Sequence, residues 1–464
     1  MAALAILTAV GHITAMTEPP SSFPETSVPV APSGAGPVAS PATPVRRRRR
    51  SASVGFVVAT LIIDSLGFGL VVPTMPLLVE QLSGSTVSNA SLWVGVSLAC
   101  FAIMQFVCAP ILGGLSDRYG RRPILLLSLA GVGANYLLLA WAPSLAWLIL
   151  GRCIAGATSA NASAATAYIA DITPPHQRAG RFGLVGASFS LGFVIGPALG
   201  GLLGTYGLRV PFLVAAALAV CNVTYGLLVL PESLPQHLRR PFNWRRANPL
   251  GSLRVLAASR NLGRLAIAWG CAWFALGALQ TSFVLANQIR FGWTTQENGL
   301  ALALAGLGSA VVQGLLVRKI IPLLGERRAA LVGSSLAMVA YLLIGLAPYG
   351  WVVLLGILVQ ASGSFTGPAV QGMVSASVGA DRQGETQGAL SSVQGLTAIV
   401  APLIAGLVFS LFAAPNASVM LPGAPFLVSA LAYGVALWAI GGVLLPKALA
   451  PVDEPEKVVV DAGG

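Results

Sequence analysis

Charged residues are scarce in this chain. Of its 464 residues only 9% are Asp, Glu, Lys or Arg, and 55% are apolar, whereas about a quarter of an ordinary soluble chain is charged. The 5 cysteines and 3 histidines form no cluster with metal-ligand spacing, so neither a metal site nor a disulfide framework is expected. Serine–histidine–aspartate, cysteine–histidine and phosphate-loop patterns are also lacking, which argues against an enzyme and predicts no cofactor.

Long apolar runs take the place of charge. A helix needs roughly 20 apolar residues to cross a bilayer, and the short alternating segments of a β-barrel are not seen. The sequence therefore predicts an all-α integral membrane protein with twelve transmembrane helices. The expected spans are 54–78, 91–112, 123–142, 145–170, 182–204, 210–230, 265–288, 297–317, 329–347, 350–373, 387–411 and 424–445.

The basic residues lie mainly on one side of this topology. The net charge is +12, and nearly all Lys and Arg fall in the run Arg46–Arg50, in alternate loops or in the central loop 231–264. Because basic loops stay in the cytoplasm, both termini are expected there, and the excess does not indicate a nucleic-acid partner. Segment 1–53, rich in Pro, Ser and Ala, is expected to be a disordered basic tail, and 446–464 a second cytoplasmic tail.

An internal repeat divides the chain at an offset of about 205 residues. Matching landmarks in the two halves are Gly120 and Gly325, Arg122 and Arg327, Gly151 and Gly356, Pro197 and Pro402, and Gly201 and Gly406. Two six-helix repeats, 54–230 and 265–445, are therefore predicted. Parallel repeats of this kind enclose a site near the membrane midplane and rock against each other, which favours a transporter.

The connection after the second span, 113–123, reads GGLSDRYGRRP and resembles the signature cytoplasmic loop of the major facilitator superfamily. A tight turn at Gly120 would bring the arginines close to acids on neighbouring helices, such as Asp171. The alternative is that the arginines only reflect topology. The resemblance implies a gating role for Gly113, Asp117, Arg118, Gly120, Arg121, Arg122 and Asp171.

The fifth span carries small residues four positions apart, from Gly192 to Gly204. This spacing puts them on one helix face, where another helix can approach closely, and Pro197 removes a backbone donor. Ordinary helix packing is the alternative explanation. The Gly-Pro-x-x-Gly-Gly arrangement resembles the motif that distinguishes drug/proton antiporters within the superfamily, with Gly192, Gly196, Pro197, Gly200 and Gly201 as its members.

Asp64 is the one acid placed well inside a predicted span. An ionised carboxylate there is costly and usually functional, and burial favours its neutral form, so Asp64 can bind and release a proton during a cycle. Arg152, the one base inside a span, is expected to modulate that proton affinity. A purely structural Asp64–Arg152 pair is the alternative.

From the first span to the last, the chain resembles the tetracycline-resistance branch of the drug/proton antiporters, as in Arg290-Phe291-Gly292-Trp293. The resemblance implies proton-coupled export of an amphipathic drug by a protein of the bacterial cytoplasmic membrane, expected to be a monomer. Tetracycline exporters carry further acids where this chain has Asn135 and Ala337, so the substrate stays open. Proton-coupled uptake of a metabolite and a non-transporting sensor are the alternatives. Candidate substrate-cavity residues are Asn135, Gln280 and Gln371.

Overall fold

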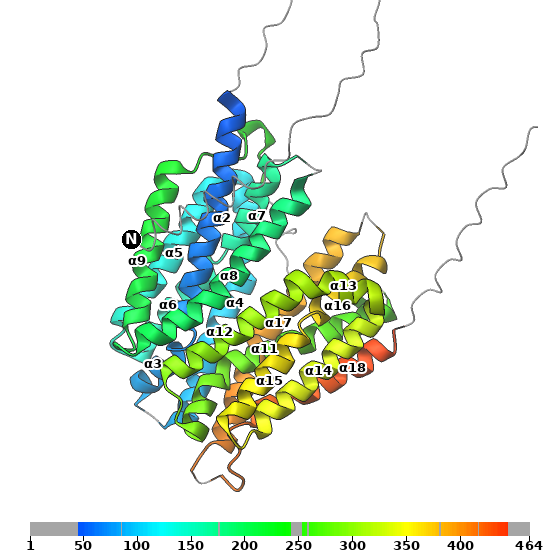
Figure 1. Cartoon of the computed structure of the whole chain (residues 1–464). Coiled ribbons are helices and arrows are strands. Elements are labelled where there is room, and N and C mark those ends of the chain that lie inside the picture. Colours follow the sequence, from blue (N-terminus) through cyan, green and yellow to red (C-terminus); the bar gives the residue numbers. More distant parts are fainter. Residues whose placement is uncertain are drawn as a thin grey trace, which may run out of the picture.

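The protein is a bundle of helices arranged in two halves (Figure 1). This computed structural model describes residues 45–84, 86–174, 177–242, 253–257, 259–379, 382–415 and 417–443, and every long element in them is a helix. The first half contains α2 (Val45–Val71), α3 (Met75–Ser83), α4 (Val87–Tyr119), α5 (Arg121–Trp141), α6 (Leu145–Thr158), α7 (Asn161–Ile172), α8 (Arg178–Gly204) and α9 (Val210–Val229). The second contains α11 (Arg260–Phe291), α12 (Thr295–Val311), the π-helix η3 (Val312–Leu316), α13 (Val317–Leu324), α14 (Glu326–Leu346), α15 (Gly350–Ser362), α16 (Thr366–Ala376), α17 (Gln383–Phe412) and α18 (Ala424–Gly441). Short helices η2 (Gln236–Leu238) and α10 (Leu253–Ala257) lie between the halves in sequence.

Helix packing repeats from one half to the other. In the first half α2 packs on α8, α5 on α9 and α4 on α6; in the second half α11 packs on α17, α14 on α18 and α12 on α15. These are the pairs that the 205-residue offset relates. The predicted duplication is therefore confirmed in three dimensions, and the architecture is the all-α fold expected from the sequence.

Two helices begin before their expected spans. The helix α2 begins at Val45 rather than at 54, and α11 begins at Arg260 rather than at 265. Arginine has a high helix propensity, so a basic segment can extend an apolar helix beyond the bilayer. Residues 1–44 of the expected N-terminal tail and the whole expected C-terminal tail lie outside the described residues.

Two expected spans are each split into two helices. Eleven helical segments in the described ranges are long and apolar enough to cross a membrane, and the remaining expected span, 145–170, is divided into α6 and α7 at Ser159 and Ala160. The matching break in the second half, at 363–365, separates α15 from α16. Because the breaks coincide under the repeat offset, the prediction of continuous helices was wrong at equivalent points in both halves.

The broken backbone is stabilised by nearby polar groups. Gln105 Nε2 donates to the hydroxyl of Ser159 over 2.9 Å, and the Thr366 hydroxyl donates to the carbonyl of Gly363 over 2.9 Å. In the second half, Pro368 lies in the first turn of α16 and has no N–H, so no helical bond can form back to Ser364. Non-helical backbone at membrane depth is tolerated where it is buried in protein or lines a cavity.

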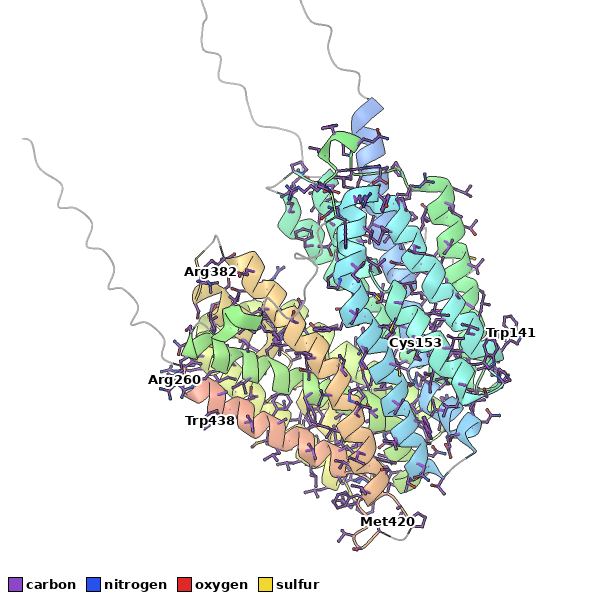
Figure 2. The ribbon with its side chains drawn as sticks, turned by 180° about the vertical axis from the view of Figure 1, so that it is seen from behind. Trp141, Cys153, Arg260, Arg382, Met420 and Trp438 are labelled. Carbon is purple, nitrogen blue, oxygen red and sulfur yellow. The ribbon has the colours of Figure 1, made fainter. Side chains whose placement is uncertain are left out.

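The outer surface is apolar. Large hydrophobic side chains such as Leu228, Leu431 and Leu323 are exposed, as expected for a surface in contact with lipid tails. Trp141 and Trp438 are also exposed and lie on opposite sides of the protein (Figure 2). Amphipathic indole rings favour the boundary between lipid and water, so these residues are well placed to anchor the bundle in a bilayer.

The two ends of the bundle differ in charge. We call the end that carries Arg118, Arg121, Arg122, Arg327 and Arg328 the basic end, and the other the opposite end. Arg260 and Arg382 lie toward the basic end of the second half, whereas Met420 lies at the opposite end (Figure 2). The chain thus keeps the charge asymmetry that the sequence predicted.

The halves touch through two glycine-lined helix pairs, α8 with α12 and α4 with α17. On α12, Gly299 packs against the carbonyl of Pro197, and on α17, Gly406 packs against the carbonyl of Ser91. A Cβ added to Gly201 would lie only 2.6 Å from the carbonyl oxygen of Thr295. These backbone contacts form the two seams, which the repeat offset interchanges, and they require glycine.

The seams end partway along the helices. Toward the basic end, a Cβ added at Gly113, Gly183, Gly186, Gly314 or Gly388 would meet no atom within 4 Å. The ribbons of the two halves also spread apart there, while their other ends stay together (Figures 1 and 2). The structure is therefore closed at the opposite end and open at the basic end.

Gly95→Ala should weaken the closed end, because its methyl group would overlap the carbonyl of Pro402. Overpacking costs about 1–3 kcal/mol, which corresponds to a shift of about 5- to 150-fold in a two-state equilibrium. With the native cysteines replaced, Val72→Cys should react severalfold faster with an impermeant thiol reagent applied from the opposite end. Gly388→Ala is the control, since its Cβ meets nothing; equal labelling rates in both variants would contradict the role assigned to the seam.

Candidate functional site

The loop between α4 and α5 forms a network of ion pairs within the first half. Arg121 contacts Asp117 over 2.7 Å and Asp171, at the end of α7, over 3.1 Å. One Arg121 nitrogen also donates to the Ser116 hydroxyl. The expected pairing of a loop arginine with Asp171 is confirmed, and it joins α4, α5 and α7 at the basic end.

Glu232, which follows α9, is a central member of this network that sequence reasoning did not single out. Its carboxylate accepts from the backbone N–H groups of Arg121 over 2.8 Å and Arg122 over 3.3 Å. These are orphan donors of the first turn of α5, where the helix dipole also favours an anion. The sequence carries no local signal for this role of Glu232, because it depends on residue 232 folding back beside residue 121.

Gly120 makes this arrangement possible. Its φ is +111°, and an added Cβ would overlap the Glu232 carboxylate. The predicted tight turn is confirmed, and its cause is both backbone conformation and lack of space. Arg122 donates to the carbonyl of Leu227 over 2.8 Å, while Arg118 is exposed and stacks over Tyr119.

The antiporter-motif glycines pack α8 against α2. Gly192 contacts Ser65, Gly196 contacts Gly69 and Gly200 contacts Leu70. The predicted close approach of a second helix is therefore confirmed. Gly201 packs against Thr295 and Gly299 of α12 instead. The ring of Pro197 lies beside Gly69 of α2 while its carbonyl meets Gly299 of α12, so α8 contacts its own half on one face and the second half on another.

Asp64 borders a small cavity inside the first half. This Asp64 cavity has about 220 Å³ of empty space. Its lining residues are Ile63, Asp64, Gly67, Leu129, Val132, Tyr136, Ala215, Ala219 and Asn222. They come from α2, α5 and α9, so the carboxylate faces the interior of one bundle and is partly buried. The polar lining is sparse, which suits a group that binds a proton rather than a hydrated ion.

Arg152 borders a separate cavity, the side cavity, with about 480 Å³ of empty space. Its lining residues are Phe68, Val71, Val72, Met75, Pro76, Val94, Leu98, Tyr136, Arg152 and Gln280. Arg152 is only 7% exposed, and its guanidinium donates to the side-chain oxygen of Asn135 over 3.3 Å. With the Asn135 amide turned over, its nitrogen also donates to the carbonyl of Gly151. Asn135 thus orients Arg152.

Tyr136 belongs to both of these cavities. Its side chain is 5% exposed, so it lies inside the bundle between the two cavities. Sequence reasoning did not single out Tyr136 as a site residue. The structure makes it the shared wall between the acid and the base that the sequence singled out.

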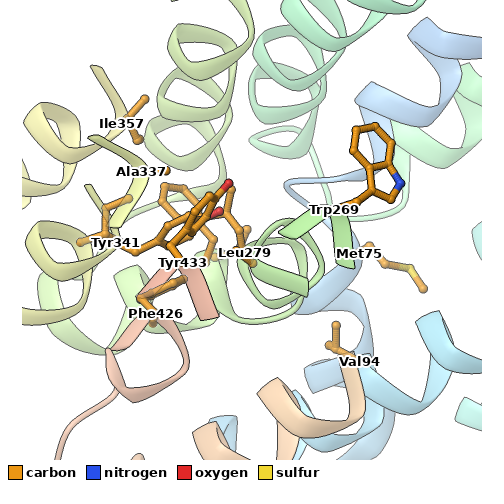
Figure 3. Packing of buried hydrophobic residues seen from close by; sticks show 14 of the residues in the cluster. Met75, Val94, Trp269, Leu279, Ala337, Tyr341, Ile357, Phe426 and Tyr433 are labelled. Atoms are coloured by element: carbon orange, nitrogen blue, oxygen red, sulfur yellow. The ribbon is translucent and has the colours of Figure 1, made fainter. Parts of the chain in front are cut away.

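A large central cavity, with about 1540 Å³ of empty space, lies between the halves. Its walls include aromatic residues from both halves (Phe189, Phe193, Trp269, Trp273, Tyr341 and Tyr433) and the amides of Gln280, Gln313 and Gln360. Tyr341 and Tyr433 stack with their ring centres 5.7 Å apart, near Ala337 (Figure 3). The cavity can hold a large amphipathic molecule.

The three candidate substrate-cavity residues take different places. Gln280 lines both the side cavity and the central cavity. Asn135 is buried beside Arg152, and Gln371 is exposed on α16; neither is among the lining residues of these cavities. Any contact of these side chains with substrate stays a prediction. In the described ranges, no group of three or more His, Cys, Asp or Glu is placed to hold a metal ion.

Glu80 and Gln288 meet at the closed end. Gln288 Nε2 on α11 donates to the Glu80 carboxylate on α3 over 3.3 Å, which links the two halves. Since opening of this end must separate α3 from α11, this hydrogen bond is one that the closed conformation alone contains.

Gly120→Ala should lower the thermal stability more than Gly325→Ala does. Both glycines have positive φ, but only at Gly120 would the Cβ also displace a carboxylate. The backbone effect alone is about 1 kcal/mol, and leaving the two N–H groups of α5 unpaired adds about 1–3 kcal/mol. Thermal unfolding of the purified variants measures both. Equal midpoints would mean that Glu232 does not stabilise the turn.

Comparisons with known proteins agree with this geometry. A profile of the Major Facilitator Superfamily matches residues 57–402. The class C tetracycline resistance protein of Escherichia coli is 38% identical over 354 residues, covering 76% of this chain and 89% of that protein. The class G protein of Vibrio anguillarum is 36% identical with the same coverage.

Solved structures show the same architecture. The human organic anion transporter MFSD10 (TETRAN) has a TM-score of 0.63 and 27% identity, covering 84% of this chain and 99% of that one. The nucleoside transporter NupG has a TM-score of 0.69 with 13% identity and the same coverage, which supports the fold alone. The chain is a multi-pass membrane transporter that belongs to the Major Facilitator Superfamily, in the branch of the tetracycline resistance proteins.

Proposed function

We propose that the protein exports an amphipathic drug, tetracycline-like or of several kinds, in exchange for protons. The observation that carries the proposal is the placement of Asp64, an acid within α2 that faces its own small cavity. Tyr136 separates this cavity from the side cavity, which shares Val72 and Gln280 with the central cavity. A proton on Asp64 and a substrate between the halves can therefore influence each other through one side chain.

The two seams supply the moving parts. With the basic end in the cytoplasm, as basic loops favour, the central cavity faces the cytoplasm and can accept a substrate there. Rocking of the halves then separates the glycine contacts and the Glu80–Gln288 bond at the opposite end. A proton that binds Asp64 from outside and leaves it inside drives the return. This cycle belongs to a monomer in a bacterial cytoplasmic membrane with both termini inside.

The relatives support export over the alternatives. Proteins 36% and 38% identical to this chain are named for tetracycline resistance, and a membrane transporter gives resistance by removing the drug from the cell. Proton-coupled uptake on the same fold differs in the direction of proton flow relative to substrate. A sensor that transports nothing needs no proton-binding acid in a buried cavity.

Asp64→Asn should abolish drug-driven proton movement, because the amide cannot bind and release a proton. Inverted membrane vesicles with an acidic interior and a pH-sensitive dye measure proton release when tetracyclines or unrelated amphipathic drugs are added. We expect drug-driven proton release from wild-type vesicles and at least tenfold less release from the variant. A factor of ten corresponds to about 1.4 kcal/mol.

The matched control is Glu385→Gln, the same change at an exposed acid whose ion pair with Arg382 spans 3.8 Å at the surface. Such pairs contribute little, so proton release should stay at the wild-type level. Unchanged release in Asp64→Asn would place coupling at another residue. Release by no compound in wild type would refute drug export, and proton movement in the same direction as a metabolite would establish uptake.

A further inference from the structure

The side cavity and the central cavity together contain one formal charge on their walls. Of the residues that line them, Arg152 is the one with a charged side chain, and no Asp or Glu is among them. Asp64 lines the Asp64 cavity on the other side of Tyr136. A ligand in the two larger cavities therefore meets a positive centre, and this field repels a cationic substrate.

Part of the Arg152 guanidinium is left without a partner. Its Nε–H is buried and has no hydrogen-bond acceptor in the described part of the chain. One terminal nitrogen is bound by Asn135, which is neutral, and the guanidinium lies 5.3 Å from the ring centre of Phe101. A buried donor of this kind costs about 1–3 kcal/mol when it is unsatisfied, and more when it is charged.

The unused donor suits a planar anion. A guanidinium can bind a carboxylate through two parallel N–H bonds, one of them from Nε. Arg152 lies on the wall of the side cavity, so an anion in that cavity meets the guanidinium, and a small turn of the side chain would bring the buried Nε–H to it. The rest of the side cavity wall is apolar except for Tyr136 and Gln280, which makes an ion pair there stronger than in water.

The central cavity provides room for the body of such a ligand. Gln280 and Val72 line both cavities, so a molecule can extend from one to the other past these residues. Trp269 and Trp273 stand in edge-to-face contact at 5.9 Å on the central wall. Flat aromatic walls of this kind favour an aromatic ligand.

We propose that the side cavity binds the acidic group of an amphipathic organic anion at Arg152, while the aromatic body of the same molecule lies in the central cavity. This rests on the proposed function only in taking the bound anion to be what is exported. Asn135 is then a positioning residue that fixes the guanidinium, and the preferred substrate carries a negative charge rather than the positive charge of a metal-chelated drug.

Binding at equilibrium tests the charge preference without requiring transport. The full chain in nanodiscs of zwitterionic phosphatidylcholine is titrated with naphthylacetate, naphthylacetamide and naphthylethylamine, which share a ring system and differ in charge. We expect naphthylacetate to bind about tenfold or more tightly than the amide, since a charge-assisted hydrogen bond is lost, and the amine to bind most weakly.

Two variants locate the preference. Arg152→Gln removes the cation. Gln280→Glu adds an acid to the wall that both cavities share, and the protein should still fold because the two side chains have the same shape. Each should abolish the preference for naphthylacetate. Gln236→Glu makes the same change at an exposed residue in the segment that connects the two halves in sequence. This control should leave the affinities for all three compounds unchanged.

Three results would overturn the assignment: no binding of naphthylacetate by wild type, equal binding of acetate and amide, or a preference that persists in both variants. Each of these can occur while Asp64→Asn still abolishes proton movement. Conversely, a charge preference that depends on Arg152, in a protein that releases no protons with any drug, would establish the anion site and refute antiport.

Discussion

Direct backbone contact between glycine-lined helices is the constraint on which the rest of the structure depends. Gly201 and Gly299 join α8 to α12, and Gly406 joins α17 to α4. Where no side chains intervene, two helices can pack closely in lipid, which provides no hydrophobic force of its own between helices. The central cavity exists because these contacts hold the halves together at one end and stop before the other.

The helix α8 connects this seam to the helix that carries Asp64. One of its faces packs against α2 at Ser65 and Gly69, which both follow Asp64 in the sequence, and another face packs against α12. A movement at the seam is therefore transmitted to the helix that carries Asp64 through contacts without flexible side chains.

Separation of charges gives the first half its chemical organisation. Asp64 and Arg152 line different cavities, and Tyr136 lies on the wall of both. At the basic end, by contrast, Asp117, Arg121 and Asp171 pair directly. The surface network fixes four helix ends relative to one another, while in the interior Asp64 and Arg152 line separate cavities.

The membrane class, the positions of most spans, the duplication and the basic end could all be predicted from the sequence, because hydropathy and charge act locally along a helix. The sequence also predicted that a loop arginine pairs with Asp171 and that the α8 glycines pack closely against another helix. Only the tertiary structure decided that α6 and α7 are separate helices, that Glu232 caps α5, that Asn135 orients Arg152 and that Tyr136 lies between two cavities. These features depend on which residues meet across the folded bundle, and no local periodicity encodes a contact between residues about a hundred positions apart, such as Glu232 and Arg121.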